Sequence, residues 1–329
     1  MITRRMPKTS RKKCAGGAGK KTRNAGTYSI IAYDPEAGQI GVAVQSHWFA
    51  VGALVAWAKA GVGAVATQSF IEPSYGSSGL EMMGSGKSAP ETLAALLAED
   101  GMKDVRQVAM IDVNDGVDAF TGDSCVDDAG HIVGHHFSVQ ANMMENERVV
   151  PMMEKTYAAS TGDLAERLLL TLEAAESAGG DIRGRQAAAM LVVRSKATGN
   201  YTADRVFDLR VDDHRQPLDE LRRLVNVARA YQHMNRGDDV FTRGDFMEAV
   251  REYRRSADML PGLVEAKFWQ AVALAAGNRM EAARPIFAEV FSQEPRWRKM
   301  VKRLPKAGIL PDEANLIDDI TGIEVKDRG

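Results

Sequence analysis

The order in which strand-like and helix-like segments follow one another constrains this chain most. Apolar and β-branched runs typical of strands fall into three groups between residues 27 and 211, and helical patterns separate the groups. The expected strands are 27–33, 40–44, 51–58, 62–67, 105–112, 117–121, 132–139, 187–193 and 206–211. The expected helices are 78–83, 88–98, 147–159 and 164–178. Because strands and helices do not alternate one by one, we expect an α+β domain in which helices cover antiparallel sheets.

The C-terminal part of the chain has a different pattern. From residue 218 onward the sequence is helical in character, and the hexapeptide GDFMEA at 244–249 recurs as GNRMEA at 277–282. This recurrence resembles tetratricopeptide repeats (TPR), whose period is about 34 residues. It predicts that Ala249 and Ala282 lie at equivalent helix crossings. The alternative is a helical hairpin without any repeat relationship.

Charge is distributed unevenly along the chain. The first 26 residues hold nine Lys or Arg and no acid, which leaves 33 basic residues against 44 acidic ones in the remainder. Binding to nucleic acid is not expected of such an acidic body, because clustered Lys and Arg provide the affinity for phosphate. No apolar run is long enough for a membrane-spanning helix.

The basic leader, residues 1–26, is predicted to be disordered, since so polar a segment buries little surface. A targeting segment and a start codon placed too far upstream are the alternatives, although the apolar stretch of an export signal is missing. Only Cys14 and Cys125 occur, so no disulfide framework is expected and a cytoplasmic location is predicted. The predicted division is a leader 1–26, a domain 27–215, a helical module 216–304 and a tail 305–329.

Thr27 is the main candidate for chemistry, because it opens the first strand and follows Gly26 directly. A threonine at a mature N-terminus offers a hydroxyl nucleophile and an α-amine that serves as its base. The glycine before it suits cleavage, since a residue without Cβ can adopt a strained backbone. The alternative is that Thr27 is an ordinary strand residue.

Several motifs in order resemble an uncharacterised bacterial family with an N-terminal-nucleophile (Ntn) hydrolase-like fold. The resemblance covers roughly residues 27–230 and rests on TYSIIAYDPEAGQIGVAVQSHWF at 27–49, VGALVAWAKAGVGAVATQSFIEPSYGSSG at 51–79, TG at 121–122, Cys125, AGH at 129–131, SVQAN at 138–142, GGDIRGRQ at 179–186 and DLRVDDH at 208–214. It implies a four-layer αββα sandwich. Members of this family usually begin at the threonine that corresponds to Thr27, whereas here a leader precedes it.

If the site is of Ntn type, a cation and an oxyanion donor are expected near Thr27. Lys59, 32 residues downstream, is the candidate cation, and its alternative is a lysine that reaches solvent from a strand end. A backbone N–H at Gln68 or Ser69, or the side-chain amide of Asn142, would serve as oxyanion donor.

A glycine-rich loop supplies candidate substrate-binding residues. Asp181 and Arg183 lie in it, and Arg183 or Arg185 would clamp a substrate carboxylate, as Gln68 would bind another polar group. The alternative is a surface turn after a helix end.

A metal site is not predicted for the histidines at 131, 135 and 136. If 132–139 is one strand, His131 and His135 are about 13 Å apart, and His135 and His136 point to opposite faces. A single zinc needs all its ligands within about 2.3 Å. No nucleotide-binding motif occurs either, so no cofactor is expected.

The sequence therefore supports two hypotheses from different classes. The first is an Ntn-type hydrolase that acts on a small amide or cyclic amide, with Thr27 as nucleophile after the leader is removed. The second is a non-catalytic scaffold whose TPR-like module docks a protein partner, since fold resemblance alone does not establish activity. The expected partners are a small-molecule substrate, a docked protein and further copies of the chain.

Overall fold

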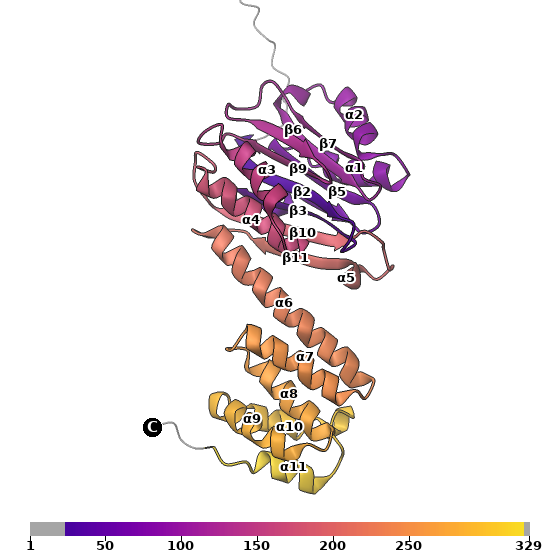
Figure 1. Cartoon of the computed structure of the whole chain (residues 1–329), viewed down its shortest axis with the longest axis vertical. Helices are drawn as coiled ribbons and strands as arrows, with labels where there is room; N and C mark the ends of the chain where they lie inside the picture. Colours follow the sequence, from indigo (N-terminus) through magenta and orange to yellow (C-terminus); the bar gives the residue numbers. More distant parts are fainter. Residues whose placement is uncertain (1–23, 326–329) are drawn as a thin grey trace, which may run out of the picture.

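Residues 24–325 are described by a computed structural model of the chain. Two stacked antiparallel sheets make up the N-terminal part, and helices make up the rest (Figure 1). The strands are β1 (Asn24–Ala25), β2 (Thr27–Asp34), β3 (Gln39–Ser46), β4 (Ala56–Lys59), β5 (Gly63–Phe70), β6 (Arg106–Asp112), β7 (Val117–Thr121), β8 (Gly130–Gly134), β9 (Phe137–Asn142), β10 (Ala187–Arg194) and β11 (Arg205–Val211). The predicted α+β class with antiparallel sheets is confirmed.

The first sheet, called sheet I here, has the order β1-β5-β6-β7, with β4 also paired to β5. Strand β4 pairs with residues 63–66 of β5 and β1 with residues 69–70, so the two strands share one edge of β5. The second sheet, sheet II, has the order β11-β10-β3-β2-β9-β8. Strand β2 therefore lies in the middle of sheet II, between β3 and β9.

Alternation along β2 places its residues on two different faces. Ile31 and its neighbours on β3 pack against Ala64 and Ile111 of sheet I, which forms the apolar layer between the sheets. Tyr28 and Ile30 face the opposite way, toward the helices. Thr27 and Ser29 have the same parity as Ile31 and therefore face the space between the sheets.

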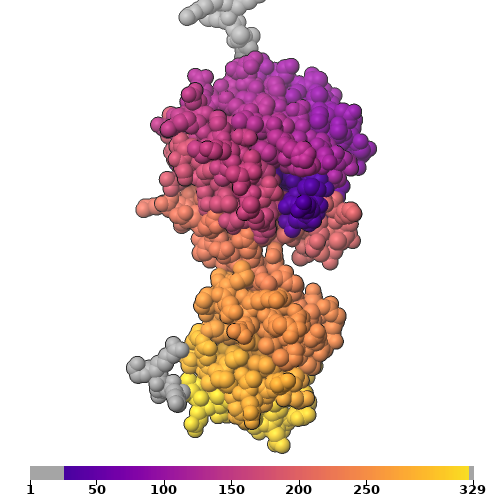
Figure 2. All heavy atoms as spheres, in the orientation of Figure 1, coloured from indigo at the N-terminus to yellow at the C-terminus, as the bar shows by residue number. Residues whose placement is uncertain are grey.

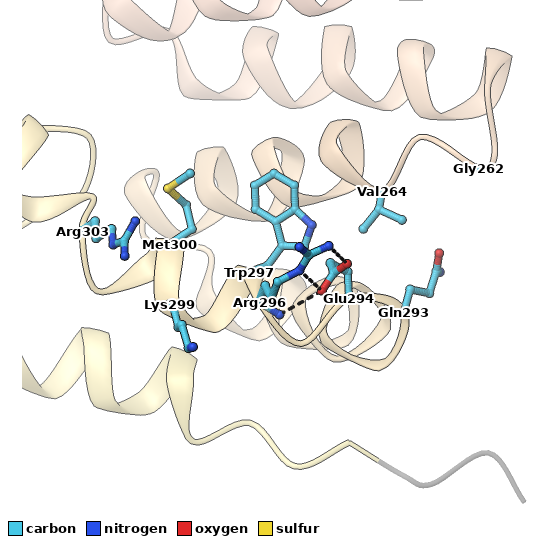
Figure 3. Close-up of a pocket in the computed structure, with 9 residues that line it drawn as sticks. All are labelled: Gly262, Val264, Gln293, Glu294, Arg296, Trp297, Lys299, Met300 and Arg303. Atoms are coloured by element: carbon cyan, nitrogen blue, oxygen red, sulfur yellow. Dashed lines mark hydrogen bonds and ion pairs between the residues drawn. The ribbon is translucent and has the colours of Figure 1, made fainter.

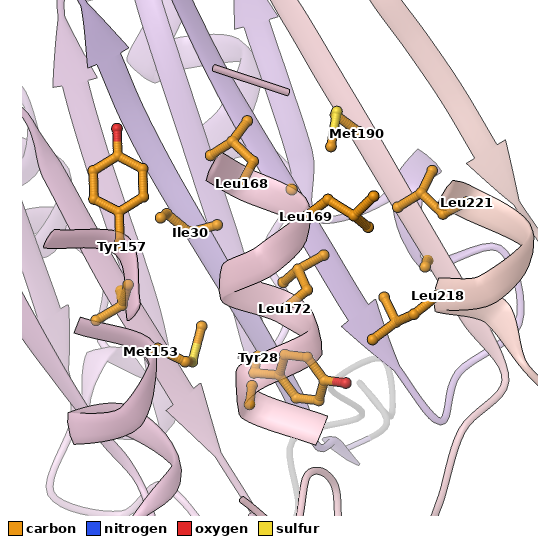
Figure 4. Packing of buried hydrophobic residues seen from close by; sticks show 14 of the residues in the cluster. Tyr28, Ile30, Met153, Tyr157, Leu168, Leu169, Leu172, Met190, Leu218 and Leu221 are labelled. Carbon is orange, nitrogen blue, oxygen red and sulfur yellow. The ribbon is translucent and has the colours of Figure 1, made fainter. Parts of the chain in front are cut away.

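Helices cover both outer faces of the stacked sheets. Helices α1 (Ser74–Gly84) and α2 (Ala89–Glu99) pack on sheet I, where Ser88 and Glu91 form the capping box that begins α2. Helices α3 (Val149–Ala159) and α4 (Leu164–Ser177) pack on sheet II. Figure 4 shows the apolar layer beneath them, in which the labelled residues are Tyr28, Ile30, Met153, Tyr157, Leu168, Leu169, Leu172, Met190, Leu218 and Leu221.

Two predicted strands have a different structure. Residues 132–139 are not one strand but a hairpin, because β8 and β9 pair with Gly134 opposite Phe137 and turn at His135 and His136. His136 has a φ of 64°, which lets the chain reverse there. The predicted strand 51–58 begins as a 3-10 turn at Val51–Ala53, and only its second half is extended, as β4.

The remaining helices form the C-terminal part of the chain. They are α6 (Pro217–Thr242), α7 (Phe246–Met259), α8 (Val264–Ala276), α9 (Met280–Gln293), α10 (Trp297–Val301) and α11 (Ala314–Thr321), whereas the short helix α5 (Tyr201–Asp204) lies between β10 and β11 in the sheet lobe. Helix α6 starts against sheet II and runs away from it, and the helices after α7 stack beyond it (Figure 1). Leu310, Ile320 and Ile323, from the segment expected to be a tail, are buried in the core of these helices.

The predicted register of the helical recurrence is wrong by one residue. Ala249 is fully buried, but Ala282 is exposed and its neighbour Ala283 is the buried residue. Ala249 and Ala283 each occupy the fourth position of their helix, α7 and α9. Helix α7 begins at Phe246, the third residue of its hexapeptide, whereas α9 begins at Met280, the fourth residue of its own, so the matching hexapeptides do not lie at matching helix positions.

The chain has two lobes joined at a narrower waist (Figure 2). Of the predicted leader, only residues 24–26 belong to the described part, and the expectation for residues 1–23 lies outside it. No helix between residues 24 and 325 has the length and apolar character needed to cross a membrane.

Candidate functional site

Thr27 is the first residue of β2 and is fully buried. Its strand partners are Ser46 on β3 and Asn142 on β9. The Thr27 Oγ1 hydroxyl donates a hydrogen bond to Ser46 Oγ over 3.0 Å. Two neighbouring strands thus hold the threonine hydroxyl at one end of sheet II.

The carbonyl group of Gly26 lies in the same cluster. It accepts hydrogen bonds from the Ser46 hydroxyl and from Arg183 Nη2, the latter over 2.7 Å. Asp181 fixes the guanidinium, because its carboxylate accepts Arg183 Nε at 3.0 Å and Nη2 at 2.7 Å. The same carboxylate accepts the backbone N–H of His47 over 3.1 Å. The carbonyl before Thr27 therefore has a hydroxyl donor and a cationic donor, both held in place.

Buried amides approach Thr27 from sheet I and from β9. Gln68 Nε2 donates to the Thr27 carbonyl over 3.3 Å, and Asn142 Nδ2 approaches the same oxygen at 3.5 Å. Both amides also donate to Gln107 Oε1, over 2.7 Å and 2.9 Å. Gln107 Nε2 in turn donates to the Ala141 carbonyl over 2.8 Å. These side chains cross the space between the two sheets and tie them together.

The hydrogen-bond network extends beyond this group. Ser29 Oγ donates to Gln68 Oε1 over 2.7 Å and accepts Gln140 Nε2 over 2.6 Å. Ser46, Gln107, Gln140 and Ser29 were not identified in the sequence. The sequence carries no signal that separates them, because polar residues that alternate along a strand equally fit a side that faces solvent. Asn142 Oδ1 is buried without a hydrogen-bond partner among the described residues, so it is available to an incoming donor.

The structure does not bring Lys59 to this site. Lys59 ends β4 and pairs with Gly63, whereas Gln68, which contacts Thr27, is five residues further along β5. That separation corresponds to about 17 Å along a strand. The side chain of Lys59 is exposed and lines a separate cavity with Leu80 and others. The cation close to Thr27 is instead Arg183.

The backbone is strained at two points next to the cluster. Ser69 and Met143 have φ values of 68° and 59°, which side chains other than glycine rarely adopt. Ser69 is buried, and its backbone pairs with Ala25 of β1 and with Arg106 of β6. Such strain is concentrated at functional sites in proteins.

Arg185 lies outside the cluster but close to it along the loop. Its guanidinium pairs with Glu176 over 2.6 Å. Arg185 also lines a cavity of ≈ 610 Å³, together with His47, Gln186, Asp213, His214 and Arg215. His47 Nδ1 is buried there without a hydrogen-bond partner among the described residues. This polar cavity adjoins the loop that carries Asp181 and Arg183.

Burial perturbs three groups around the site. It raises the pKa of Tyr28 well above its usual value, helped by the carboxylate of Glu176, which accepts the phenol hydrogen over 2.5 Å. It raises the pKa of the Cys125 thiol, so this cysteine is disfavoured as a thiolate nucleophile. It lowers the pKa of His131, against the opposing effect of the Asp118 charge.

The histidines are arranged differently from the sequence expectation, since His135 and His136 form a turn with ring centroids 3.7 Å apart. Within residues 24–325, no group of three or more His, Cys, Asp or Glu side chains is close enough to hold a metal ion. His131 Nδ1 instead lies 2.8 Å from Thr121 Oγ1, which accepts Gln107 Nε2 over 2.9 Å. His131 is thus linked to the amide network.

The C-terminal helices contain cavities of their own. One of them, of ≈ 680 Å³, lies between the start of α8 and helices α9 and α10. Figure 3 shows Trp297 and Met300 beside the cationic side chains of Lys299 and Arg303, while Arg296 is paired with Glu294. This surface combines apolar and positively charged groups.

Comparison with other proteins matches residues 27–221 to a family of unknown function, DUF1028. A crystal structure of a protein from Silicibacter pomeroyi, described as a member of the same family, is similar to this chain with 29% sequence identity and a TM-score of 0.56. The similarity covers 62% of this chain and 89% of that one. No curated protein is significantly similar. The family match spans more than half of the chain, from Thr27 through Ser46 and Asn142 to Arg183. The chain therefore belongs to the DUF1028 family.

Proposed function

We propose that the protein is a hydrolase of the N-terminal-nucleophile type that acts on a small amide or cyclic amide. Thr27 is the nucleophile once residues 1–26 have been removed. One observation carries the proposal. The Thr27 hydroxyl and the Gly26 carbonyl share the Ser46 hydroxyl, and the Arg183 guanidinium binds the same carbonyl. The layer order of helices, two sheets and helices supports the assignment to an Ntn-type αββα sandwich.

This arrangement suits cleavage of the bond between Gly26 and Thr27. Thr27 Oγ1 forms a bond to the Gly26 carbonyl carbon, the C–N bond breaks, and the hydroxyl proton passes to the nitrogen that becomes the α-amine. Water then hydrolyses the ester and frees the Thr27 hydroxyl. Arg183 and Ser46 stabilise the negative charge that develops on the carbonyl oxygen, as oxyanion donors do.

In the processed chain each residue has a separate role. The Thr27 α-amine, with a pKa near 8 in unperturbed termini, accepts the hydroxyl proton. Arg183 takes the cationic role that was expected of Lys59, and Asp181 keeps the Arg183 guanidinium in place. Gln68 and Asn142 hold the Thr27 carbonyl and so orient the nucleophile. The backbone of Ser69 pairs with Ala25 and so borders the place of the leader, while Arg185 lines the polar cavity next to the loop of Asp181 and Arg183.

Intact mass of the full-length protein tests the proposal. We expect the native protein to begin at Thr27, and the Thr27→Ala and Arg183→Ala variants to keep residues 1–26. Thr161→Ala, at an exposed threonine, serves as the control and should be processed like the unchanged chain. Native protein that retains the leader, beyond loss of Met1, would contradict the proposal.

A second candidate function is a scaffold that does not catalyse a reaction. The cavity beside Trp297 and Met300, with the cations Lys299 and Arg303, favours it, because mixed apolar and cationic surfaces bind acidic peptides (Figure 3). The helices α7 to α9 would then act as a TPR-like docking module. If Thr27→Ala changes neither processing nor any turnover, this scaffold becomes the better description.

A further inference from the structure

We propose that the space occupied by residues 24–26 is the acyl side of the substrate site, and that it selects an extended peptide with glycine at the cleaved bond. This inference rests on the proposed hydrolase function and deepens it. It assigns a substrate class, a glycyl amide within a peptide, and a residue that enforces the glycine, Met143.

The backbone of the leader occupies a place that another peptide can take. Asn24 and Ala25 pair antiparallel with Phe70 and Ser69, at the part of the β5 edge that β4 leaves uncovered. When residues 24–26 leave, this edge loses its partner. Extended peptides bind such edges through main-chain hydrogen bonds, so the edge would align the acyl side of a peptide substrate.

The position of Gly26 is tighter than a side chain ordinarily tolerates. A Cβ atom there would lie 3.0 Å from Arg183 Nη2, 3.0 Å from Asp181 Oδ1 and 3.0 Å from Met143 Cβ. The first two atoms belong to an ion pair and cannot move apart freely. The third is fixed by the Met143 backbone, which has a φ of 59°. A residue with a Cβ at this position therefore requires three separate neighbours to shift by a few tenths of an ångström.

Space, rather than backbone conformation, is the reason for glycine here. Gly26 does not have a positive φ, so the strained conformation expected from the sequence is not present. The same crowding would apply to any acyl group whose carbonyl is held by Arg183 and Ser46. Alanine in that position would push against the ion pair and the Met143 Cβ.

The reaction on a peptide follows the same atoms. Thr27 Oγ1 bonds to the glycyl carbonyl carbon, the amide C–N bond breaks, and the hydroxyl proton passes through the α-amine to the leaving amine. Water adds to the glycyl ester, releases a carboxylate and returns the proton to Thr27. No oxidant or further reactant is required.

The test uses the full chain after it has released its leader. Two fluorogenic peptides are compared, acetyl-Asn-Ala-Gly-aminomethylcoumarin and acetyl-Asn-Ala-Ala-aminomethylcoumarin. We expect kcat/KM to be at least about tenfold higher for the glycyl peptide, because one extra methyl group overpacks the site. In the uncleaved chain, Gly26→Ala should slow leader release by a similar factor.

A variant that widens the site gives the second readout. Met143→Gly removes one of the three crowding atoms and suits the backbone at φ 59°, so the ratio of glycyl to alanyl turnover should fall toward one. Met102→Gly, at an exposed methionine, is the matched control and should leave the ratio unchanged.

The outcomes separate this inference from the function on which it rests. A chain that keeps its leader overturns the hydrolase proposal, and the inference with it. A processed chain that cleaves both peptides equally, or neither, overturns the glycine assignment alone. An unchanged ratio in Met143→Gly, together with normal leader release by Gly26→Ala, overturns it as well.

Discussion

At the scale of single residues, neutral amides dominate the space around Thr27. Gln68, Gln107 and Asn142 are almost completely buried and bond to one another across the two sheets. Burying an amide group costs free energy unless its hydrogen bonds are made. Here the Gln107 Oε1 atom accepts two hydrogen bonds, one from Gln68 and one from Asn142. The network therefore specifies how the sheets stack, in addition to holding the Thr27 carbonyl.

Replacing Gln107 tests how much this network contributes. Gln107→Leu removes the acceptor of Gln68 and Asn142 and leaves both donors buried without that partner. We expect the free energy of unfolding to fall by about 3 kcal/mol, since the variant loses several buried hydrogen bonds of Gln107 that contribute about 0.5–1.5 kcal/mol each. Urea denaturation measures the change. Gln293→Leu, at an exposed glutamine, should change stability by less than about 0.5 kcal/mol; similar effects of both substitutions would contradict the prediction.

His131 makes the stability of the molecule depend on pH. Burial lowers the pKa of His131 in the folded state, so the folded protein binds this proton less readily than the unfolded chain does. The contribution of His131 to the free energy of unfolding is therefore complete above the usual histidine pKa of about 6.5. As the pH falls from 6.5 through the lower folded-state pKa, the unfolded chain binds the proton more readily, and this contribution is lost. The Tm of the unchanged protein should therefore decrease more between pH 8 and pH 5 than that of His131→Gln.

Calorimetric Tm values across this pH range provide the measurement. His214→Gln, at an exposed histidine, is the control and should follow the profile of the unchanged protein. Parallel profiles for His131→Gln and the unchanged protein would show that this histidine does not couple protonation to folding.

At the scale of elements, periodicity predicted most strands and helices but not the tight connections. The alternation in β2 and the leucine pattern in α4 were clear because one face of each is buried. The turn between β8 and β9 was missed, since His135 and His136 are not typical turn residues. The prediction that Lys59 lies near Thr27 was wrong, because the number of residues between them does not indicate which end of a strand the lysine occupies.

The candidate site was predicted in part, for a similar reason. Thr27, Asn142, Gln68, Asp181 and Arg183 are brought together by the fold. Their proximity could be expected only from a family resemblance, because they come from four separate segments spread between residues 27 and 183. Ser46 and Gln107 were missed because nothing in one sequence distinguishes a polar strand residue that faces a core from one that faces solvent.

The corrected register of α7 and α9 leads to a prediction about two adjacent alanines. Ala283→Leu should lower the free energy of unfolding by about 1–3 kcal/mol, because Ala283 is fully buried and a larger side chain overpacks the helix contact. Ala282→Leu, at the exposed neighbour, should change it by less than about 0.5 kcal/mol. Urea denaturation of the two variants decides between the registers, and a larger loss for Ala282→Leu would restore the original one.

At the scale of the whole molecule, α6 belongs to both lobes. Leu218, Leu221 and Val225 are buried under sheet II, whereas Met234, further along the same helix, is buried against α7. Arg222 also pairs with Glu173 of α4 over 2.7 Å. One helix therefore contributes to two apolar cores, so loss of either core removes support from the other.

Unfolding of the two lobes should for this reason be coupled. Trp48 and Trp57 lie in the sheet lobe, and Trp269 and Trp297 lie in the C-terminal helices. If one pair is replaced with Phe, the fluorescence of the remaining pair reports on the unfolding of its own lobe. We expect coincident urea transitions from both reporters. Leu221→Ala should move both midpoints downward together, with a loss of about 2–5 kcal/mol. Two separate transitions, of which only one responds to Leu221→Ala, would show that the lobes unfold independently.

The length of α6 has a consequence for anything that binds the C-terminal helices. A helix of 26 residues is about 39 Å long, and α6 runs away from sheet II, so a ligand beside Trp297 is bound in the other lobe from Thr27 (Figure 1). Such a ligand could not place an atom of its own at the nucleophile. It would act as a tether for a substrate that is attached to it. The tether raises the local concentration of that substrate at the sheet lobe and leaves the intrinsic rate of the reaction unchanged.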